Sequence, residues 1–148
     1  MKKINRILLF SVMLLTSHIT FGQLAENDSV NLIVAEMDSS NVYETSYTVG
    51  YAGSISKQYL RMEKLSGIIS NNKLTDLALH YPNAVVRLYA LLLLKQKKIT
   101  IPENIVVAFA NDATSVNTLN GCYGGVGSVR SLSNEILNLS GIKKIRFQ

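Results

Sequence analysis

Apolar residues recur every three or four positions in six separate stretches of the chain, and this spacing is typical of amphipathic helices. A capping residue or a proline begins some of these stretches, as at Asp28 or Ser29 and at Pro102. Patterns typical of strands are almost absent. We therefore expect helices at about 29–37, 56–70, 72–80, 83–95, 102–111 and 128–139.

The stretch from Asn83 to Leu94 contains the most apolar of these predicted helices. Its apolar residues cover nearly the whole circumference, so the helix must be buried between neighbours. It is too short to span a membrane, and Arg87 lies within it. A helix that packs on both sides is expected in a stacked helical array. The sequence therefore predicts an all-α fold of five or six short helices.

A short helix, a Pro82-Asn83 turn and a second helix that opens with Val86-Arg87 make up residues 72–95. Ala90 follows three residues after the arginine, and Leu94 four residues further on. This segment resembles a HEAT-type repeat, although Tyr81-Pro82-Asn83 replaces the usual Asp-containing turn. The resemblance implies a short HEAT-like right-handed α-α array.

Two further segments extend this resemblance. Gly50-Tyr51-Ala52-Gly53 precedes most of the helices, and Gly121-Cys122 follows them. In this respect the chain is similar to small exported HEAT-like proteins of Bacteroidetes-type bacteria. The resemblance implies a fold and a compartment, and it implies no reaction.

The N-terminus has the order of zones that is typical of a signal peptide. Lys2, Lys3 and Arg6 precede an apolar run, and small or polar residues follow up to Gly22. The run is shorter than the roughly 20 apolar residues that a spanning helix needs. We therefore expect a signal peptide at 1–22, a HEAT-like domain at 23–148 and a periplasmic or secreted protein without stable membrane insertion after cleavage.

Export changes the charge of the protein. The chain has 15 Lys and Arg against 10 Asp and Glu, and the expected signal peptide contains three of the basic residues and no acidic one. The mature chain would thus carry 12 basic residues against 10 acidic ones, a net charge of +2. Such a small excess gives no reason to expect a nucleic-acid partner.

Residues 38–54 have no apolar periodicity, and we expect them to form a long loop. Tyr43, Tyr47 and Tyr51 recur in it every four residues among Ser, Thr and Gly, a composition typical of adaptable binding surfaces. The three tyrosines are therefore the predicted binding residues for another exported protein. The alternative is that they hold this loop against the helices.

The glycine-rich segment 121–128 precedes the last predicted helix but lacks the Lys-Ser/Thr of a P-loop and the dinucleotide-binding spacing. We expect it to be a flexible hairpin or turn between two helices. Cys122 has no charged neighbour that would lower its pKa, so we expect a buried, inert thiol, with a reactive or intermolecular thiol as the alternative.

The residues that commonly carry out catalysis are few. His80 is the only histidine beyond the expected signal peptide, and one His with one Cys is not a metal-ligand set. We therefore expect neither enzymatic activity nor a metal or cofactor, and the predicted function is a non-catalytic interaction module. The alternative is a hydrolase in which Asp76, four residues earlier, orients His80 toward a remote serine.

The signal-peptide hypothesis predicts that cells export a mature chain that begins at or near Gln23. Intact-mass analysis of the exported fraction measures this directly. A membrane-bound species that retains Met1 would show instead that the segment is an anchor.

Overall fold

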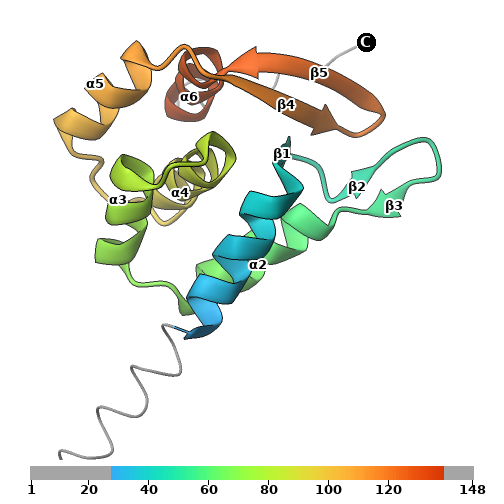
Figure 1. The fold of residues 1–148 in the computed structure, drawn as a ribbon, viewed down its shortest axis with the longest axis horizontal. Helices are drawn as coiled ribbons and strands as arrows, with labels where there is room; N and C mark the ends of the chain where they lie inside the picture. The colour runs from blue at the N-terminus through green and yellow to red at the C-terminus, as the bar shows by residue number, and fades with distance from the viewer. Residues whose placement is uncertain (1–27, 139–148) are drawn as a thin grey trace, which may run out of the picture.

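The computed structural model describes residues 28–138, in which six helices accompany five short strands (Figure 1). The helix at residues 28–40 is called the N-terminal helix below. The further elements are β1 Val42–Glu44, β2 Thr48–Val49, β3 Ser54–Ile55, α2 Lys57–Ile68, α3 Asn71–His80, α4 Ala84–Gln96, α5 Glu103–Asn111, β4 Ser115–Asn120, β5 Tyr123–Ser128 and α6 Val129–Asn138. The predicted signal peptide lies outside the described residues.

The predicted all-α array is wrong, because the described chain folds into a mixed α/β structure. The six helices lie close to the positions expected from the apolar spacing, but strands interrupt their succession in two places. In particular, α5 and α6 are separated by the β4–β5 hairpin, so they do not follow one another as stacked helices do. No described helix is long and apolar enough to cross a membrane.

The strands leave no recognisable pattern in the sequence, for physical reasons. β1, β2 and β3 are only three, two and two residues long, which is too short for an alternating pattern. β5 is Tyr-Gly-Gly-Val-Gly-Ser, and glycine is depleted in strands because it has no side chain to pack. The predicted loop at 38–54 therefore contains β1, β2 and the first residue of β3.

Helix α4 is the centre of the hydrophobic core, as its apolar circumference predicted. Leu88, Leu91, Leu93 and Leu94 are completely buried. The helix packs on α3 and α6 and also on β1 and α2. A buried helix thus has a strand among its neighbours, where the sequence suggested helices alone.

The turn between α3 and α4 connects the N-terminal helix to the core through Asn83. The Asn83 side-chain oxygen caps α4 by accepting from the amide of Val85 at 2.8 Å. Its side-chain nitrogen donates to the Asp38 carboxylate at 2.7 Å. An aspartate could cap the helix equally well but could not donate, which accounts for asparagine at this position.

The second contact of the Asp38 carboxylate is with Tyr81. The Tyr81 hydroxyl donates to Asp38 at 3.1 Å. Partial burial, together with the hydrogen bond and the negative charge of Asp38, raises the pKa of Tyr81. The hydroxyl therefore remains a donor, and the end of the N-terminal helix is fastened to the turn by two hydrogen bonds.

The larger sheet has the strand order β1-β4-β5. β1 is parallel to β4, with Tyr43 opposite Thr118, and β4 is antiparallel to β5. The two-residue turn of the β4–β5 hairpin begins at Gly121, whose φ of +57° suits a glycine. Residues 121–128, expected as a flexible hairpin or turn, thus form the turn and the second strand of a hairpin whose first strand is β4.

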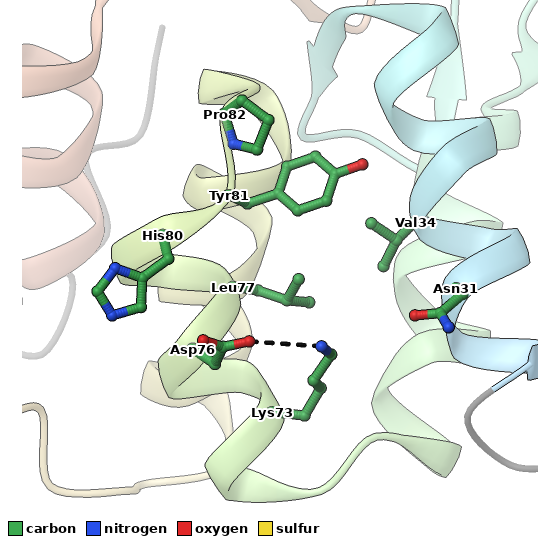
Figure 2. Close-up of a pocket in the computed structure, with 8 residues that line it drawn as sticks. All are labelled: Asn31, Val34, Lys73, Asp76, Leu77, His80, Tyr81 and Pro82. Carbon is green, nitrogen blue, oxygen red and sulfur yellow. Dashed lines mark hydrogen bonds and ion pairs between the residues drawn. The ribbon is translucent and has the colours of Figure 1, made fainter. Parts of the chain in front are cut away.

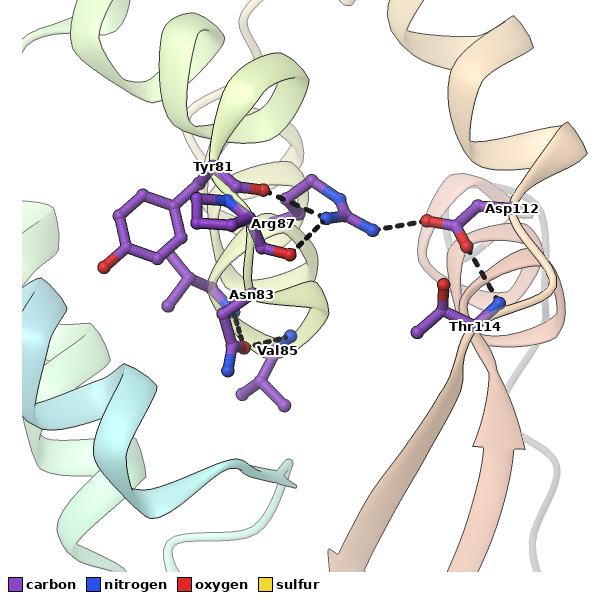
Figure 3. A network of polar contacts seen from close by, with 8 residues as sticks. Tyr81, Asn83, Val85, Arg87, Asp112 and Thr114 are labelled. Carbon is purple, nitrogen blue, oxygen red and sulfur yellow. Dashed lines mark hydrogen bonds and ion pairs between the residues drawn. The ribbon is translucent and has the colours of Figure 1, made fainter.

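Arg87 connects the α3–α4 turn to the junction of α5 and β4 (Figure 3). Its guanidinium donates to the carbonyl oxygens of Tyr81 and Pro82 at 3.0 and 2.9 Å, and it forms an ion pair with Asp112. Burial by itself would raise the pKa of Asp112. Hydrogen bonds from Thr114 and the charge of Arg87 outweigh burial and hold the pKa of Asp112 below its usual value.

We predict that Leu93→Ala lowers the free energy of unfolding by about 2–5 kcal/mol, because it leaves a cavity in the core. Lys97→Ala, at the exposed end of α4, should change it by less than about 0.5 kcal/mol. Urea titration of both variants compares the two values. Small and equal effects would show that α4 is not the centre of the core.

We also predict that Asp112→Asn lowers the free energy of unfolding at neutral pH by about 1–3 kcal/mol. Folding lowers the pKa of the Asp112 carboxyl, so its charge stabilises the fold at any pH above the unfolded pKa of about 4. This stabilisation disappears as the pH falls through the pKa of the carboxyl in the folded state. The difference between the variant and the wild type should therefore shrink in acid.

Asp76→Asn is the matched control for this measurement, because Asp76 has only an exposed contact with Lys73 at 3.4 Å. Urea titrations of the three proteins from pH 7 downward give the comparison. A loss for Asp112→Asn that is constant with pH would contradict the role given to the charge.

Candidate functional site

The β2–β3 hairpin and the β4–β5 hairpin project from the same side of the molecule and lie side by side (Figure 1). The amide of Gly50 donates to the carbonyl oxygen of Gly121 at 3.0 Å, and the thiol of Cys122 donates to the carbonyl oxygen of Gly50 at 3.4 Å. The turns of the two hairpins are thus fastened to each other. We call residues 47–55 and 120–126 together the hairpin surface.

The chain between β1 and β2 strengthens this connection. Ser46 donates through its hydroxyl to the side-chain oxygen of Asn120 and accepts from the amide of Gly121 at 3.1 Å. The amide of Thr45 donates to Leu119 at 3.2 Å. Several hydrogen bonds therefore hold the β2–β3 hairpin in one position on the sheet.

The other end of the β2–β3 hairpin is fixed by the start of α2. The amide of Ser56 donates to the carbonyl oxygen of Tyr47 at 2.9 Å. The hydroxyl of the same serine is the N-cap of α2 and accepts from the amide of Tyr59 at 2.8 Å. The hairpin therefore begins and ends on rigid elements.

The three predicted binding tyrosines occupy very different places. Tyr51 is 99% exposed at the turn of the β2–β3 hairpin, and Tyr47 is 50% exposed with its ring edge-on to Tyr59 at 5.7 Å. Tyr43 is only 3% exposed and belongs to the core. The structure thus leaves Tyr51 fully available for a partner, Tyr47 partly available, and Tyr43 not at all.

Tyr43 lies in β1, and its ring packs against that of Tyr89 at 4.9 Å. Burial and, to a smaller extent, the charge of Glu135 raise the pKa of Tyr43. Tyr43 has the structural role that the sequence analysis gave as the alternative for all three tyrosines. The four-residue spacing could not separate these roles, because it does not show where a strand begins.

Sequence reasoning missed Tyr123, the first residue of β5, which is 85% exposed. Val126 on the same strand is also exposed. Cys122, expected to be buried, lies exposed in the turn because the β4–β5 hairpin extends away from the core. The available signal in the sequence is an aromatic residue inside a glycine-rich segment.

The hairpins differ from the rest of the protein in charge. Residues 45–55 and 113–128 contain no Asp, Glu, Lys or Arg, although 17% of the chain is charged. Exposed edges of sheets are commonly protected by charged side chains, lysine above all. An uncharged, partly aromatic surface of this kind is suited to contact with another protein.

The residues of the alternative hydrolase lie elsewhere, beside a shallow cavity of about 250 Å³ between α3 and the N-terminal helix. Figure 2 shows the imidazole of His80 directed away from that helix, whereas Leu77 and Tyr81 point toward it. The Asp76 carboxylate faces Lys73 at 3.4 Å and forms no hydrogen bond with His80. No serine lines this cavity in the part of the chain that the structure describes.

The arrangement around His80 therefore lacks the two contacts that a serine hydrolase needs, a hydroxyl beside the imidazole and a carboxylate bound to it. The described residues also contain no group of three or more His, Cys, Asp or Glu side chains that could hold a metal ion. Chemistry based on His80 thus has no support from the geometry.

Comparison with known proteins adds no identification. No protein-family model matches the chain, and neither a curated protein nor a solved structure gave a match. The resemblance of residues 72–95 to a HEAT-type repeat therefore stays a prediction from the sequence, and the argument for a function depends on the hairpin surface itself.

Proposed function

We propose that this protein is an exported, non-catalytic interaction module that binds another exported protein through the hairpin surface. The observation that carries the proposal is the pair of uncharged hairpins, fastened to each other at Gly50 and Gly121, with Tyr51 and Tyr123 exposed on them. The proposal of export depends on the N-terminal sequence, and the proposal of binding depends on the geometry.

Tyrosines in fixed positions are effective contacts for a protein partner. A tyrosine side chain offers a large, partly apolar area and loses little conformational entropy when it is immobilised. The hydrogen bonds at Ser46, Ser56 and Gly50 order the backbone of these hairpins before any partner arrives. Such preorganisation reduces the free energy that binding must spend on ordering loops.

The outer edge of β5 provides a second means of binding. β5 pairs with β4 only, and no described residue pairs with its other edge. The strand carries no charged residue that would repel an incoming strand. Backbone groups on this edge could therefore bind an extended segment of the partner, as in other proteins that recognise strands.

A double substitution, Tyr51→Ser with Tyr123→Ser, tests the proposal. We expect capture of the partner from the exported fraction, measured by quantitative mass spectrometry, to weaken by more than about tenfold, or on the order of 1.4 kcal/mol. The melting temperature should change little, because both side chains are exposed. Tyr47 is left intact because its contact with Tyr59 stabilises the fold.

Leu32→Ala with Val107→Ala is the matched control, since these exposed apolar residues lie on the N-terminal helix and on α5. The control should capture the partner as the wild type does. Unchanged capture by the tyrosine variant would contradict the proposal, and a large drop in its melting temperature would show that the tyrosines cover the fold.

A further inference from the structure

A second cavity, of about 380 Å³, lies where β1, α2, α4 and α6 meet. Its apolar walls are formed by Met62 of α2, Leu92 of α4 and Ile136 of α6. The aromatic ring of Tyr59 also lines it. A cavity with such walls is suited to an aliphatic chain of a few carbon atoms.

Two carboxylates, Glu44 and Glu135, line the same cavity, and no lysine or arginine does. The Oε2 atom of Glu44 accepts from the Ser56 hydroxyl, and its Oε1 atom accepts from no described residue. Glu135 has no ion pair with any residue between 28 and 138. The nearby Arg61 is bound to Glu36 at 2.9 Å and to Gln58 at 3.2 Å. The negative charge of the cavity is thus not balanced from within the described protein.

A further polar group of the cavity is the hydroxyl of Tyr43. The side chain is almost completely buried, yet its hydroxyl has no hydrogen-bond partner among the described residues. No fully enclosed polar side-chain atom in this part of the chain lacks a partner. The Tyr43 oxygen must therefore reach accessible space, and Tyr43 lines this cavity. The Tyr43 hydroxyl can therefore form a hydrogen bond with a molecule that enters the cavity.

We propose that this cavity binds a primary alkylammonium group, with the ammonium at Glu44, Glu135 and Tyr43 and the alkyl stem against Met62, Leu92 and Ile136. An ammonium has three N–H donors, and the two carboxylates and the Tyr43 hydroxyl are acceptors for them.

Other cations fit this cavity less well. Ca²⁺ takes six to eight oxygen ligands, several of them carboxylates, whereas this cavity has two carboxylates beside neutral polar side chains of Tyr43, Thr45, Tyr59 and Gln96. The described residues contain no group of three or more His, Cys, Asp or Glu side chains that could hold a metal ion. A neutral alcohol would fill the apolar part but would leave both carboxylates unpaired. The combination of negative charge and aliphatic walls therefore selects an amine with an apolar stem.

Calorimetric titration with n-pentylammonium chloride tests the proposal on protein purified from cells that express the full chain. We expect n-pentanol, which has the same stem without the charge, to bind at least about tenfold more weakly. Glu135→Gln should weaken pentylammonium binding by about tenfold, because it removes a charge-assisted hydrogen bond. Tyr43→Phe should weaken it by about threefold to tenfold.

Glu63→Gln is the control, because Glu63 is exposed on α2 and does not line the cavity. Thermal unfolding of each variant separates a loss of binding from a loss of fold, and Glu135 is exposed enough for its variant to fold. Equal affinity for the amine and the alcohol, or an unchanged affinity in Glu135→Gln, would overturn the proposal.

A second titration identifies the source of the amine. Nα-acetyl-lysine methylamide carries the same stem and ammonium on a peptide unit. Binding as tight as that of pentylammonium would assign the cavity to a lysine side chain, and binding at least about tenfold weaker would assign it to a small free amine.

Discussion

The hydroxyl of Tyr89 donates to the carbonyl oxygen of Glu44 at 2.9 Å and accepts from the amide of the same residue at 2.8 Å. A tyrosine hydroxyl can do both at once, and the Tyr89 side chain of α4 is completely buried. Burial raises the pKa of Tyr89 and outweighs the hydrogen bond with the Glu44 backbone, which lowers it, so the donor proton is retained. The contact fixes a three-residue strand to the core of the protein, and the position of the larger sheet depends on it.

One edge of β1 pairs with β4, and side chains from the helices satisfy the other edge. Besides Tyr89, the buried amide of Gln58 donates to the carbonyl oxygens of Met37 and Val42, both at 3.1 Å. A strand this short would not be stable alone, because each unpaired backbone group in the interior costs free energy. The helices therefore replace the missing neighbouring strand, and β4, β5 and both hairpins are built outward from that point.

One edge of the sheet is covered and the other is exposed, and this difference bears on the proposed function. The β1 edge is covered by polar side chains from α2 and α4, whereas the β5 edge lies beside exposed Tyr123 without charge or cover among the described residues. Gly127 keeps β5 close to α6, because a side chain there would meet Leu132 at 3.1 Å. Gly127 therefore allows the base of the hairpin to pack against α6, while the turn at the other end remains free to contact a partner.

The amino-acid sequence by itself determined the helices and the buried position of α4. Their caps, such as Ser56 and Asn83, and their apolar spacing act within one turn of helix, so local chemistry is sufficient to place them. The sequence also indicated Tyr51 as exposed contact area, from its place among small polar residues. The sequence could not show that Tyr51 is exposed and Tyr43 is buried, because that difference depends on which residues form β1.

Only the tertiary structure decided the strands, the hairpin surface and the cavity below β1. β1 exists because Tyr89 and Gln58, 45 and 16 residues away from their strand partners, satisfy its backbone. The cavity likewise joins Glu44 to Glu135, which come from separate ends of the described chain. Contacts over such separations leave no periodic pattern in the sequence, since each partner is chosen by its position in space and not by its neighbours along the chain.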